Sequence, residues 1–503
     1  MRGEHQADRE KKRDEKRWHA TSCTQESIRQ VRTRIDRRSG YRPTIENTPP
    51  SNRTFLWGLL TTAFVLRLLP MLIWPNEACV RDECMYVFTA ERMLEGQGMT
   101  ATNGWMWAPG YISVIAAHLG ISEWVTGVDN GLAGSIWGLQ LLCALGATWL
   151  LLDLGRRTFD ERTARIAAGL YAVSPTYVFF TKQLWSEALY GPLILLLIWA
   201  LVRLRQSGWA WACFCGALAG LCVLFKGVAV YMTPLLLFVV IWKRTRQRSA
   251  WLHGLLLLAV AAAVVTPYSL YASNKFGTTI ISDRSLGQMM WLGNNVFEPV
   301  TFDWGNGQIP AKKLARHTKI GRERCAPKSQ PMKRDTCETA AGVAWIEANP
   351  TEFFRRIPMR VAQTMNPHSF LTRHLRWNRW KGLPQWVDEV LIGLVVLFSL
   401  LASWGAAIGA WGRGGGPVLI GAAVVTAYHL AACAALAGLT RYRLPIEALW
   451  YLFAAAALAD PKRCLSTLRQ HRWRACGALC TLGLVAWTTL WYLPVGFKWW
   501  GAW

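Results

Sequence analysis

The 503-residue chain is poor in acidic side chains, with 31 Asp and Glu against 56 Lys and Arg, and its formal net charge is +25. Such a charge is common among proteins that bind nucleic acid. Here, however, most of the basic residues lie in the gaps between apolar segments. We therefore expect no nucleic-acid partner.

The sequence also lacks a metal-binding signature and an internal repeat. Its nine His show no ligand spacing such as His-Glu-x-x-His. The neighbouring carboxylates of Asp82 and Glu83 would diverge on a helix, so they make a poor cation site. We expect no metal and no cofactor. Thirteen Cys is an odd number, and most of them lie in apolar segments, where Cys acts as a small hydrophobic residue.

Apolar residues make up 52% of the chain and occur in runs of about twenty, such as residues 391–410. A run of that length matches the hydrocarbon thickness of a bilayer. The 29 Trp fit the same interpretation, because indole favours the membrane interface. We predict an all-α polytopic membrane protein with about ten or eleven transmembrane helices. The apolar runs cover residues 55–74, 131–152, 163–180, 184–202, 209–225, 228–242, 250–270, 389–411, 417–437, 443–459 and 475–494.

Residues 1–54 are polar and charged, with a composition typical of a disordered tail. We expect no cleavable signal peptide, and we interpret residues 55–74 as an uncleaved signal anchor. If the basic tail is cytoplasmic, alternation places short basic loops on its side, as cytoplasmic loops require. These loops contain Arg156–Arg157, Arg203–Arg205, residues 243–248, Arg413 and residues 462–474.

This topology divides the chain into a basic tail (1–54), a transmembrane catalytic module (55–270), an extracytoplasmic loop (271–388) and C-terminal transmembrane helices (389–503). The module contains a first outer loop at residues 75–130. Long loops cross the membrane largely regardless of charge, so the basic second loop is compatible with an outer position. We expect a multi-pass protein of the inner (plasma) membrane with its active site on the periplasmic side.

The first outer loop is predicted to hold a short amphipathic helix from Asp82 to Glu95, because Tyr86, Ala90, Met93 and Leu94 recur at helical spacing. Gly96 is the expected C-terminal cap. Asp82 has two compatible interpretations. It is a favoured helix N-cap, and it is also a candidate general base at the mouth of a membrane cavity.

Glu187 lies just inside the outer end of the fourth apolar run, where a carboxylate is costly unless it faces protein or water. We regard it as a functional candidate, with Lys182 as a possible partner; the alternative is an interfacial acid in a frayed turn. Lys226 is predicted near the outer surface, where it either contacts a ligand or extends to the interface. Arg67, inside the first run, either pairs with an acid, binds an anion or has a structural role.

Arg441 and Arg443 open the tenth predicted helix on the outer side. Two Arg separated by one residue can bracket a phosphate, since the guanidinium group matches phosphate geometry. An ordinary charged helix start is the alternative.

These segments resemble the membrane glycosyltransferases of the C-fold class. The nearest branch is that of bacterial aminoarabinose transferases and protein O-mannosyltransferases, with the related lipopolysaccharide sugar transferases. The similar motifs, in chain order, are Asp82-Glu83-x-x-Tyr86, Gly96, Ala108-Pro109-Gly110-Tyr111, Ser186-Glu187-x-Leu189-Tyr190, Phe225-Lys226-Gly227, Pro267 with Asn274-Lys275-Phe276-Gly277, and residues 441–445.

The resemblance implies a sugar donor on a polyprenyl phosphate, used with inversion at the anomeric carbon, and a glycan, lipid or protein acceptor. It implies that Asp82 is the catalytic base, that Glu187 is a second outer acid, and that Lys226 lies near the donor phosphate. The remaining candidate substrate-binding residues are Glu83, Tyr86, Arg67, Lys182, Arg441 and Arg443. This chain has Trp107-Ala108-Pro109 where some members have Lys before the Pro.

Three rival interpretations stay open: a secondary transporter or lipid flippase, a glycan polymerase or ligase, and a structural membrane subunit. Clustered outer acids and the absence of a repeat favour the enzyme. The second outer loop is basic, which suits either an anionic acceptor or anionic lipid headgroups. Two Cys pairs, Cys79 with Cys84 and Cys325 with Cys337, could form disulfides on an oxidising side.

Overall fold

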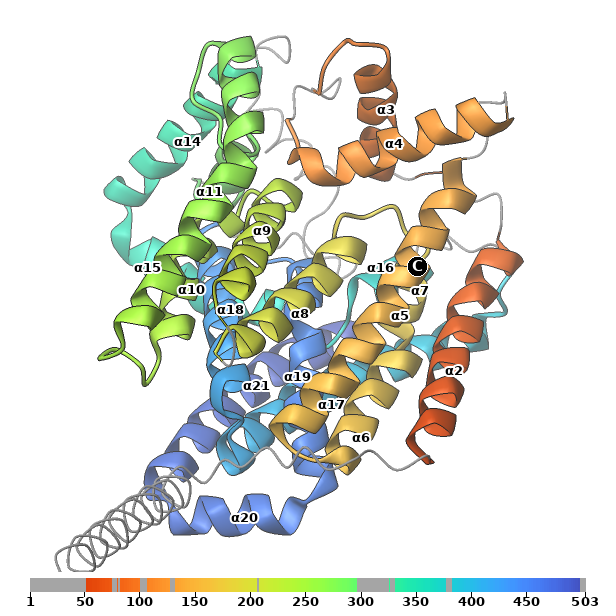
Figure 1. Ribbon diagram of the computed structural model, residues 1–503, viewed down its shortest axis with the longest axis vertical. Helices are drawn as coiled ribbons and strands as arrows, with labels where there is room; N and C mark the ends of the chain where they lie inside the picture. Colours follow the sequence, from red (N-terminus) through yellow and green to blue (C-terminus); the bar gives the residue numbers. More distant parts are fainter. Residues whose placement is uncertain are drawn as a thin grey trace, which may run out of the picture. The chain divides into compact units, whose positions relative to one another are not determined.

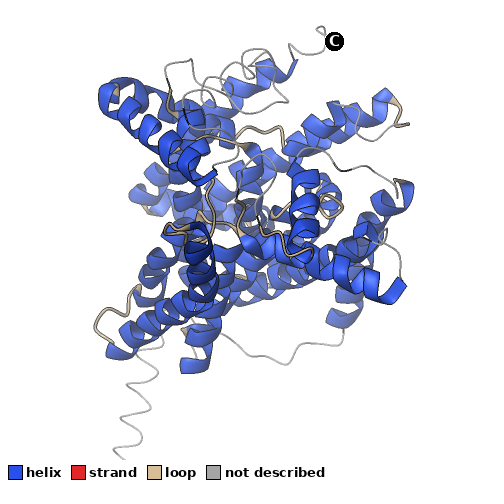
Figure 2. Ribbon diagram, turned by 90° about the horizontal axis from the view of Figure 1, so that it is seen from above, coloured by secondary structure: helices blue, strands red, loops and turns tan. Residues whose placement is uncertain are grey.

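The computed structural model describes residues 51–74, 79, 82–99, 106–126, 132–205, 208–295, 325, 331–376 and 382–497. Most of the predicted tail therefore lies outside the described residues. The chain divides into two units, Met1–Thr54 and Phe55–Trp503, and the second contains the helix bundle. The described residues of this unit form helices and no strand (Figures 1 and 2), apart from one isolated bridge between Met106 and Arg284.

The helices in chain order are α2 (Ser51–Ile73), α3 (Asp82–Leu94), α4 (Pro109–Thr126), α5 (Leu132–Thr158), α6 (Glu161–Val173), α7 (Pro175–Phe180), α8 (Glu187–Leu204), α9 (Trp209–Phe225), α10 (Ala229–Ile241), α11 (Arg248–Phe276), α12 (Leu286–Gly293), α14 (Pro331–Ala348), α15 (Pro350–Thr364), α16 (Phe370–Arg376), α17 (Gln385–Arg413), α18 (Gly416–Ala435), the 3-10 helix η1 (Thr440–Arg443), α19 (Leu444–Ala459), α20 (Pro461–Gln470) and α21 (Arg472–Phe497).

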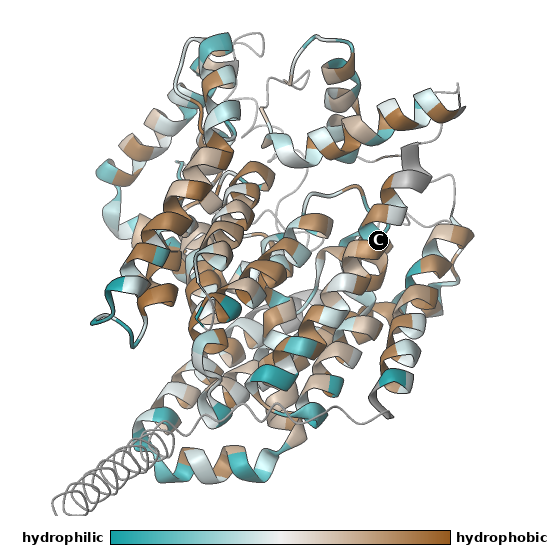
Figure 3. Cartoon of the chain, viewed as in Figure 1, coloured by the Kyte–Doolittle hydropathy of each residue, from teal (hydrophilic) through white to brown (hydrophobic). Residues whose placement is uncertain are grey.

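The predicted apolar runs lie mostly in helices, and the all-α polytopic class is confirmed. Residues 163–180, predicted as one run, are divided between α6 and α7 at Ser174. Among the described helices, α2, α5, α8, α11, α17 and α18 are long and apolar enough to cross a bilayer by length and composition. Others are apolar but shorter: α10 has 13 residues, about 20 Å at 1.5 Å per residue. Figure 3 colours the ribbon by residue hydropathy: apolar residues dominate the long helix α11, and polar residues lie near its two ends.

The core forms around α19, whose residues are almost all buried. Its Ala-rich stretch lets neighbouring helices approach closely, as small residues do in membrane bundles. The long helix α17 packs along α19, and a Cβ at Gly409 of α17 would overlap the carbonyl oxygen of Phe453. Helices α6 and α8 contact α19 as well.

One end of the helix bundle is held together by Arg413, at the end of α17. Its guanidinium reaches Asp160 at 2.8 Å and Asp460 at 3.3 Å. Asp160 also caps α6 by accepting from the Thr163 amide, and Asp460 caps α20 by accepting from the Arg463 amide. Thus the loop after α5, the end of α17 and the start of α20 meet. Figure 1 shows α20 at the opposite end of the long axis from α3 and α4.

Both Cys pairs that the sequence left open are disulfide-bonded, Cys79 to Cys84 and Cys325 to Cys337. The first joins Cys79 to Cys84 in the first turn of α3, and the second joins Cys325 to Cys337 of α14. The free Cys of the described residues lie in α5, α9, α18, α20 and α21.

Candidate active site

Helix α3 begins at Asp82 and ends at Leu94, and Gly96 follows with a φ of 73°, in the left-handed region. The predicted helix and its Gly cap are therefore confirmed. Tyr86, one turn after Asp82, is buried and fixes α3 against the next helix. Its ring lies 4.9 Å from that of Trp107 and 5.3 Å from that of Tyr111. These tilted and edge-to-face ring contacts hold Asp82 at a defined position.

Glu187 is the first residue of α8, directly after the irregular segment 181–186 that separates α7 from α8. Its side chain is buried, and its carboxylate accepts from the neighbouring Ser186 hydroxyl at 3.2 Å. A buried carboxylate needs cationic or hydrogen-bonding partners to offset the loss of water. Residues distant in the sequence supply these partners.

Lys226 and Arg441 connect the two predicted catalytic acids. The Lys226 ammonium donates to Glu187 Oε1 at 2.8 Å, and Arg441 Nε lies 3.9 Å from the same oxygen. Arg441 Nη1 donates to Asp82 Oδ2 at 3.0 Å. Four residues from α3, α8, η1 and the turn after α9 thus form one continuous chain of charges, which we call the cavity cluster: Asp82, Arg441, Glu187 and Lys226.

The two acids of the cavity cluster differ in accessibility. The Asp82 side chain is 33% exposed, whereas that of Glu187 is 1% exposed. Arg441 is held between them, with its guanidinium 4.6 Å from the centre of the Trp185 ring. Asp82 is therefore the carboxylate that a bound molecule can reach, and Glu187 anchors the two cations.

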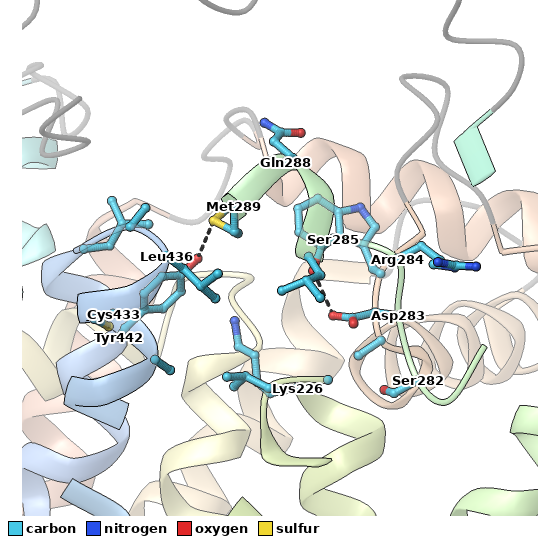
Figure 4. A pocket seen from close by; sticks show the side chains of 18 of the residues that line it. Lys226, Ser282, Asp283, Arg284, Ser285, Gln288, Met289, Cys433, Leu436 and Tyr442 are labelled. Carbon is cyan, nitrogen blue, oxygen red and sulfur yellow. Dashed lines mark hydrogen bonds between the residues drawn. The ribbon is translucent and has the colours of Figure 1, made fainter. Parts of the chain in front are cut away.

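The cavity cluster borders a cavity of about 1540 Å³. Residues of α10, α12, α14 and α18 complete its wall, including apolar side chains such as Val230, Ala432 and Leu436. Figure 4 shows part of this wall, where the Lys226 ammonium faces the space between Tyr442 and Asp283. The cavity is thus lined by the charged residues of the cavity cluster and by apolar side chains.

Four predicted substrate-binding residues do not line this cavity. Arg67 is buried and donates to the carbonyl oxygens of Ala172 and Tyr171, at 2.8 and 3.1 Å. Lys182 is buried too, where its ammonium donates to the Trp74 carbonyl. It does not pair with Glu187, the partner suggested by sequence.

Glu83 is buried on α3, and Arg443 is buried at the end of η1, directly before α19. Arg443 Nε donates to Glu447 at 2.8 Å, and its Nη2 donates to the Ser399 hydroxyl at 2.9 Å. We call Arg443, Glu447 and Ser399 the sealed cluster. Of the predicted residues, Asp82, Tyr86, Glu187, Lys226 and Arg441 line the cavity. The ligand-binding roles of the other four stay predictions.

The cavity also contains residues that the sequence did not single out, above all Asp283, in the segment between α11 and α12. Its carboxylate accepts from the Ser285 hydroxyl at 3.0 Å. Burial raises the pKa of Asp283 from 3.8 to about 6, against the opposing effects of the Ser285 hydrogen bond and the Lys226 charge. No spacing pattern marks this residue, because it follows an irregular stretch.

Asp335 of α14 and Arg284 form a second ion pair in the same wall, with Arg284 Nη1 3.1 Å from Asp335 Oδ2. Asp335 also accepts from the Gly287 amide at 2.8 Å. The Arg284 amide donates to the Met106 carbonyl at 2.9 Å. This segment therefore links the first outer loop to α14.

A sequence model of the dolichyl-phosphate-mannose-protein mannosyltransferase family matches residues 123–271. The resemblance to these membrane glycosyltransferases is confirmed. The match begins within α4, ends within α11 and includes Glu187 and Lys226; Asp82 and Arg441 lie outside it. No curated protein is a significant sequence match to the chain.

Solved structures with a similar arrangement include the archaeal oligosaccharyltransferase AglB from Archaeoglobus fulgidus, in complex with an inhibitory peptide and a dolichol-phosphate. It is 15% identical, with a TM-score of 0.47, over 90% of this chain and 56% of AglB. This chain thus spans about half the length of that enzyme. ArnT from Cupriavidus metallidurans, bound to undecaprenyl phosphate, is 14% identical over 81% of this chain and 77% of ArnT, with a TM-score of 0.36.

Proposed function

We propose that the protein is an inverting glycosyltransferase that moves a sugar from a polyprenyl-phosphate donor to a glycan, lipid or protein acceptor on the outer face of the membrane. The observation that carries this proposal is the cavity cluster. Two acids and two cations from distant parts of the chain meet at one cavity with apolar walls. A structural subunit has no need of such an arrangement.

Asp82 is suited to be the general base. It is the more accessible acid, and a positioned base is worth roughly 10²–10⁴-fold in rate. The acceptor oxygen forms a bond to the anomeric carbon while its proton passes to Asp82. On the opposite face of the sugar, the bond from the anomeric carbon to the phosphate oxygen breaks, and its electron pair stays on that oxygen. The anomeric configuration is therefore inverted.

Lys226 and Arg441 are suited to stabilise the phosphate that leaves. Each is already held by a carboxylate, so little reorganisation is needed when charge develops on the phosphate oxygen. The apolar wall formed by Val230, Ala432 and Leu436 offers a surface for the polyprenyl chain. The family that matches residues 123–271 takes its name from a sugar on such a lipid, which supports this donor class.

The disulfides support an outer position for the cavity. Cys79–Cys84 lies beside Asp82, and Cys337 lies on α14, which lines the cavity. Disulfides persist in oxidising compartments, whereas Cys464 near the Arg413 end is free. Lys226, at the end of α9, and Arg413 would then face opposite sides of the inner membrane.

The proposal is tested by mass spectrometry of envelope lipids and glycans from cells that lack the protein. We expect one sugar mass to disappear from one acceptor, and expression of the wild-type protein, but not Asp82→Asn, to restore it. Full restoration by Asp82→Asn would remove Asp82 from the mechanism. An unchanged glycan profile together with a transport defect would favour the transporter.

A further inference from the structure

Asp283 differs from every other acid discussed in the cavity, because it has no cation of its own. Asp82 and Glu187 are paired with Arg441 and Lys226, and Asp335 is paired with Arg284. Asp283 accepts from Ser285 and forms no ion pair within the described part of the chain. It nevertheless lines the cavity beside the Lys226 turn (Figure 4).

The Asp283 carboxylate is seated on the turn that carries Lys226. A side chain at Gly227 would collide with Asp283 Oδ1, so only Gly allows this approach. The preceding residue adds a second attachment, since the buried Ser282 hydroxyl donates to the Val223 carbonyl of α9 at 2.6 Å. Asp283 is thus fixed where a phosphate held by Lys226 would face it.

The charges already present make an ionised Asp283 unfavourable for that phosphate. The two cations of the cavity cluster are balanced by its two carboxylates, so the cluster offers an arriving anion no net positive charge. A second unpaired anion nearby adds repulsion in a site of low dielectric. A neutral carboxylic acid, in contrast, has an O–H group that can donate to a phosphate oxygen.

We propose that Asp283 binds the donor phosphate as a neutral carboxylic acid, so that donor binding is accompanied by uptake of one proton. The proton comes from water and resides on the Asp283 carboxyl, from which it donates to a phosphate oxygen. This inference rests on the proposed function, since it requires a lipid phosphate at Lys226. Burial, which raises the pKa of Asp283 to about 6, makes that uptake accessible near neutral pH.

The charged and titratable groups that face Asp283 come from several elements. They are Lys226 in the turn after α9, Tyr268 on α11, Asp335 on α14 and its neighbour Arg284. Lys226 favours the ionised form of Asp283, while Asp335 and burial favour the neutral form. Ser285 favours the ionised form through its hydrogen bond.

The test measures binding of undecaprenyl methyl phosphate to the purified full chain in lipid nanodiscs between pH 5 and 8. This probe is a phosphodiester, so its own charge does not change in that range, and it has no sugar to transfer. In the wild type, we expect affinity to fall as pH rises above about 6, by about 30-fold between pH 5 and pH 7.5. Above the pKa of Asp283, the carboxylate must take up a proton before the probe binds.

Asp283→Asn carries a neutral side chain at every pH. We expect its affinity to be independent of pH and, at pH 7.5, about 30-fold higher than that of the wild type, a gain that mere structural damage would not produce. Ser285→Ala should move the fall in affinity to higher pH, because it removes a hydrogen bond that favours the ionised carboxylate. Asp335→Asn, the matched control, should retain the fall in affinity but move it to lower pH, because the Asp335 charge favours the neutral form of Asp283.

Two results would overturn this inference alone: Asp283→Asn with the same fall in affinity as the wild type, or Asp283→Asn with weaker binding at every pH. Absence of probe binding to the wild type at all pH values would instead overturn the proposed function, and this inference with it.

Discussion

Arg441 and Arg443 lie two residues apart in η1 and belong to two different charge clusters. Arg441 reaches Asp82 and Glu187 in the cavity cluster, which opens on a cavity of about 1540 Å³. Arg443 lies in the sealed cluster with Glu447 and Ser399, packed between α17 and α19. Both guanidinium groups are buried and paired. Only the first cluster has a carboxylate that a ligand can reach.

The comparison separates two uses of buried charge. In the sealed cluster, each charge serves mainly to compensate the other, and such pairs contribute little net stability over apolar residues of similar size. In the cavity cluster, the same kind of pairing leaves Asp82 partly exposed and places two cations around a space for a ligand. We therefore expect substitutions in the cavity cluster to affect activity and those in the sealed cluster to affect stability.

The largest effect is expected from Asp82→Asn. The amide keeps the shape of the side chain but cannot accept the acceptor's proton, so transfer should fall roughly 10²–10⁴-fold. Thermal unfolding of the purified protein should change little, because Asp82 is partly exposed. Turnover with the sugar donor identified by the lipid analysis measures the first quantity. Retained turnover would contradict the assignment of the base.

Arg443→Met should have the opposite effect, with a large loss of stability. It leaves the Glu447 carboxylate buried without its cation, which costs roughly 3–5 kcal/mol in the free energy of unfolding. The yield and the midpoint of thermal unfolding in one detergent measure this loss. Arg441→Met is the matched control, since Glu187 keeps Lys226 as a partner and Asp82 can reach water. It should reduce turnover more than stability. If both variants lowered the midpoint of thermal unfolding by the same amount, the two clusters would not differ in their contribution to stability.

The sequence predicted the helices and the four residues of the cavity cluster, but it did not predict which of these residues pair with each other. Helix α3 and its Gly96 cap follow from local spacing, which the sequence displays. The ion-pair partner of Glu187, in contrast, does not follow from local spacing. Lys182 is close in sequence, yet the irregular segment 181–186 turns it toward Trp74, and Lys226 arrives from another helix.

The two Arg of η1 show the same limit. In a 3-10 helix each residue advances about 120°, so residues two apart cannot point the same way. A pattern of two Arg around one residue therefore does not by itself bracket a phosphate. The sequence did not predict Asp283 as a site residue, because its place in the cavity depends on contact with Gly227, 56 positions earlier in the chain. Tertiary contacts of this kind have no local sequence signal.

A double substitution should recover most of the stability that Arg443→Met loses. Arg443→Met together with Glu447→Leu replaces the buried ion pair by apolar residues of similar volume, and such replacements are often neutral or stabilising. We expect the double variant to unfold close to the wild-type temperature and to retain turnover. If it were as unstable as Arg443→Met alone, the hydrogen bonds to Ser399 and Asn366 would be the main contribution of Arg443.

The smallest effect is expected in a third set of charges, on α15, where Glu352 accepts from Arg355 and Arg356 at 2.6 and 2.8 Å. These hydrogen bonds lower the pKa of Glu352 from 4.5 to about 2. Its contribution is therefore complete above about pH 4.5 and is lost as pH falls toward 2. Arg355 is 75% exposed and Glu352 is 28% exposed, so solvent screens their charges, and the buried Arg356 keeps its hydrogen bond to the Asn295 carbonyl. Glu352→Gln should therefore cost less than about 1 kcal/mol at pH 7.

Thermal unfolding of the wild type and Glu352→Gln at pH 7 and pH 3 measures this contribution, and the difference between the two proteins should be smaller at pH 3. A loss at pH 7 as large as that of Arg443→Met would mean that exposure does not govern the value of these ion pairs. The contrast between buried and exposed clusters would then fail, because solvent screening is the reason that α15 should tolerate a change that the sealed cluster cannot.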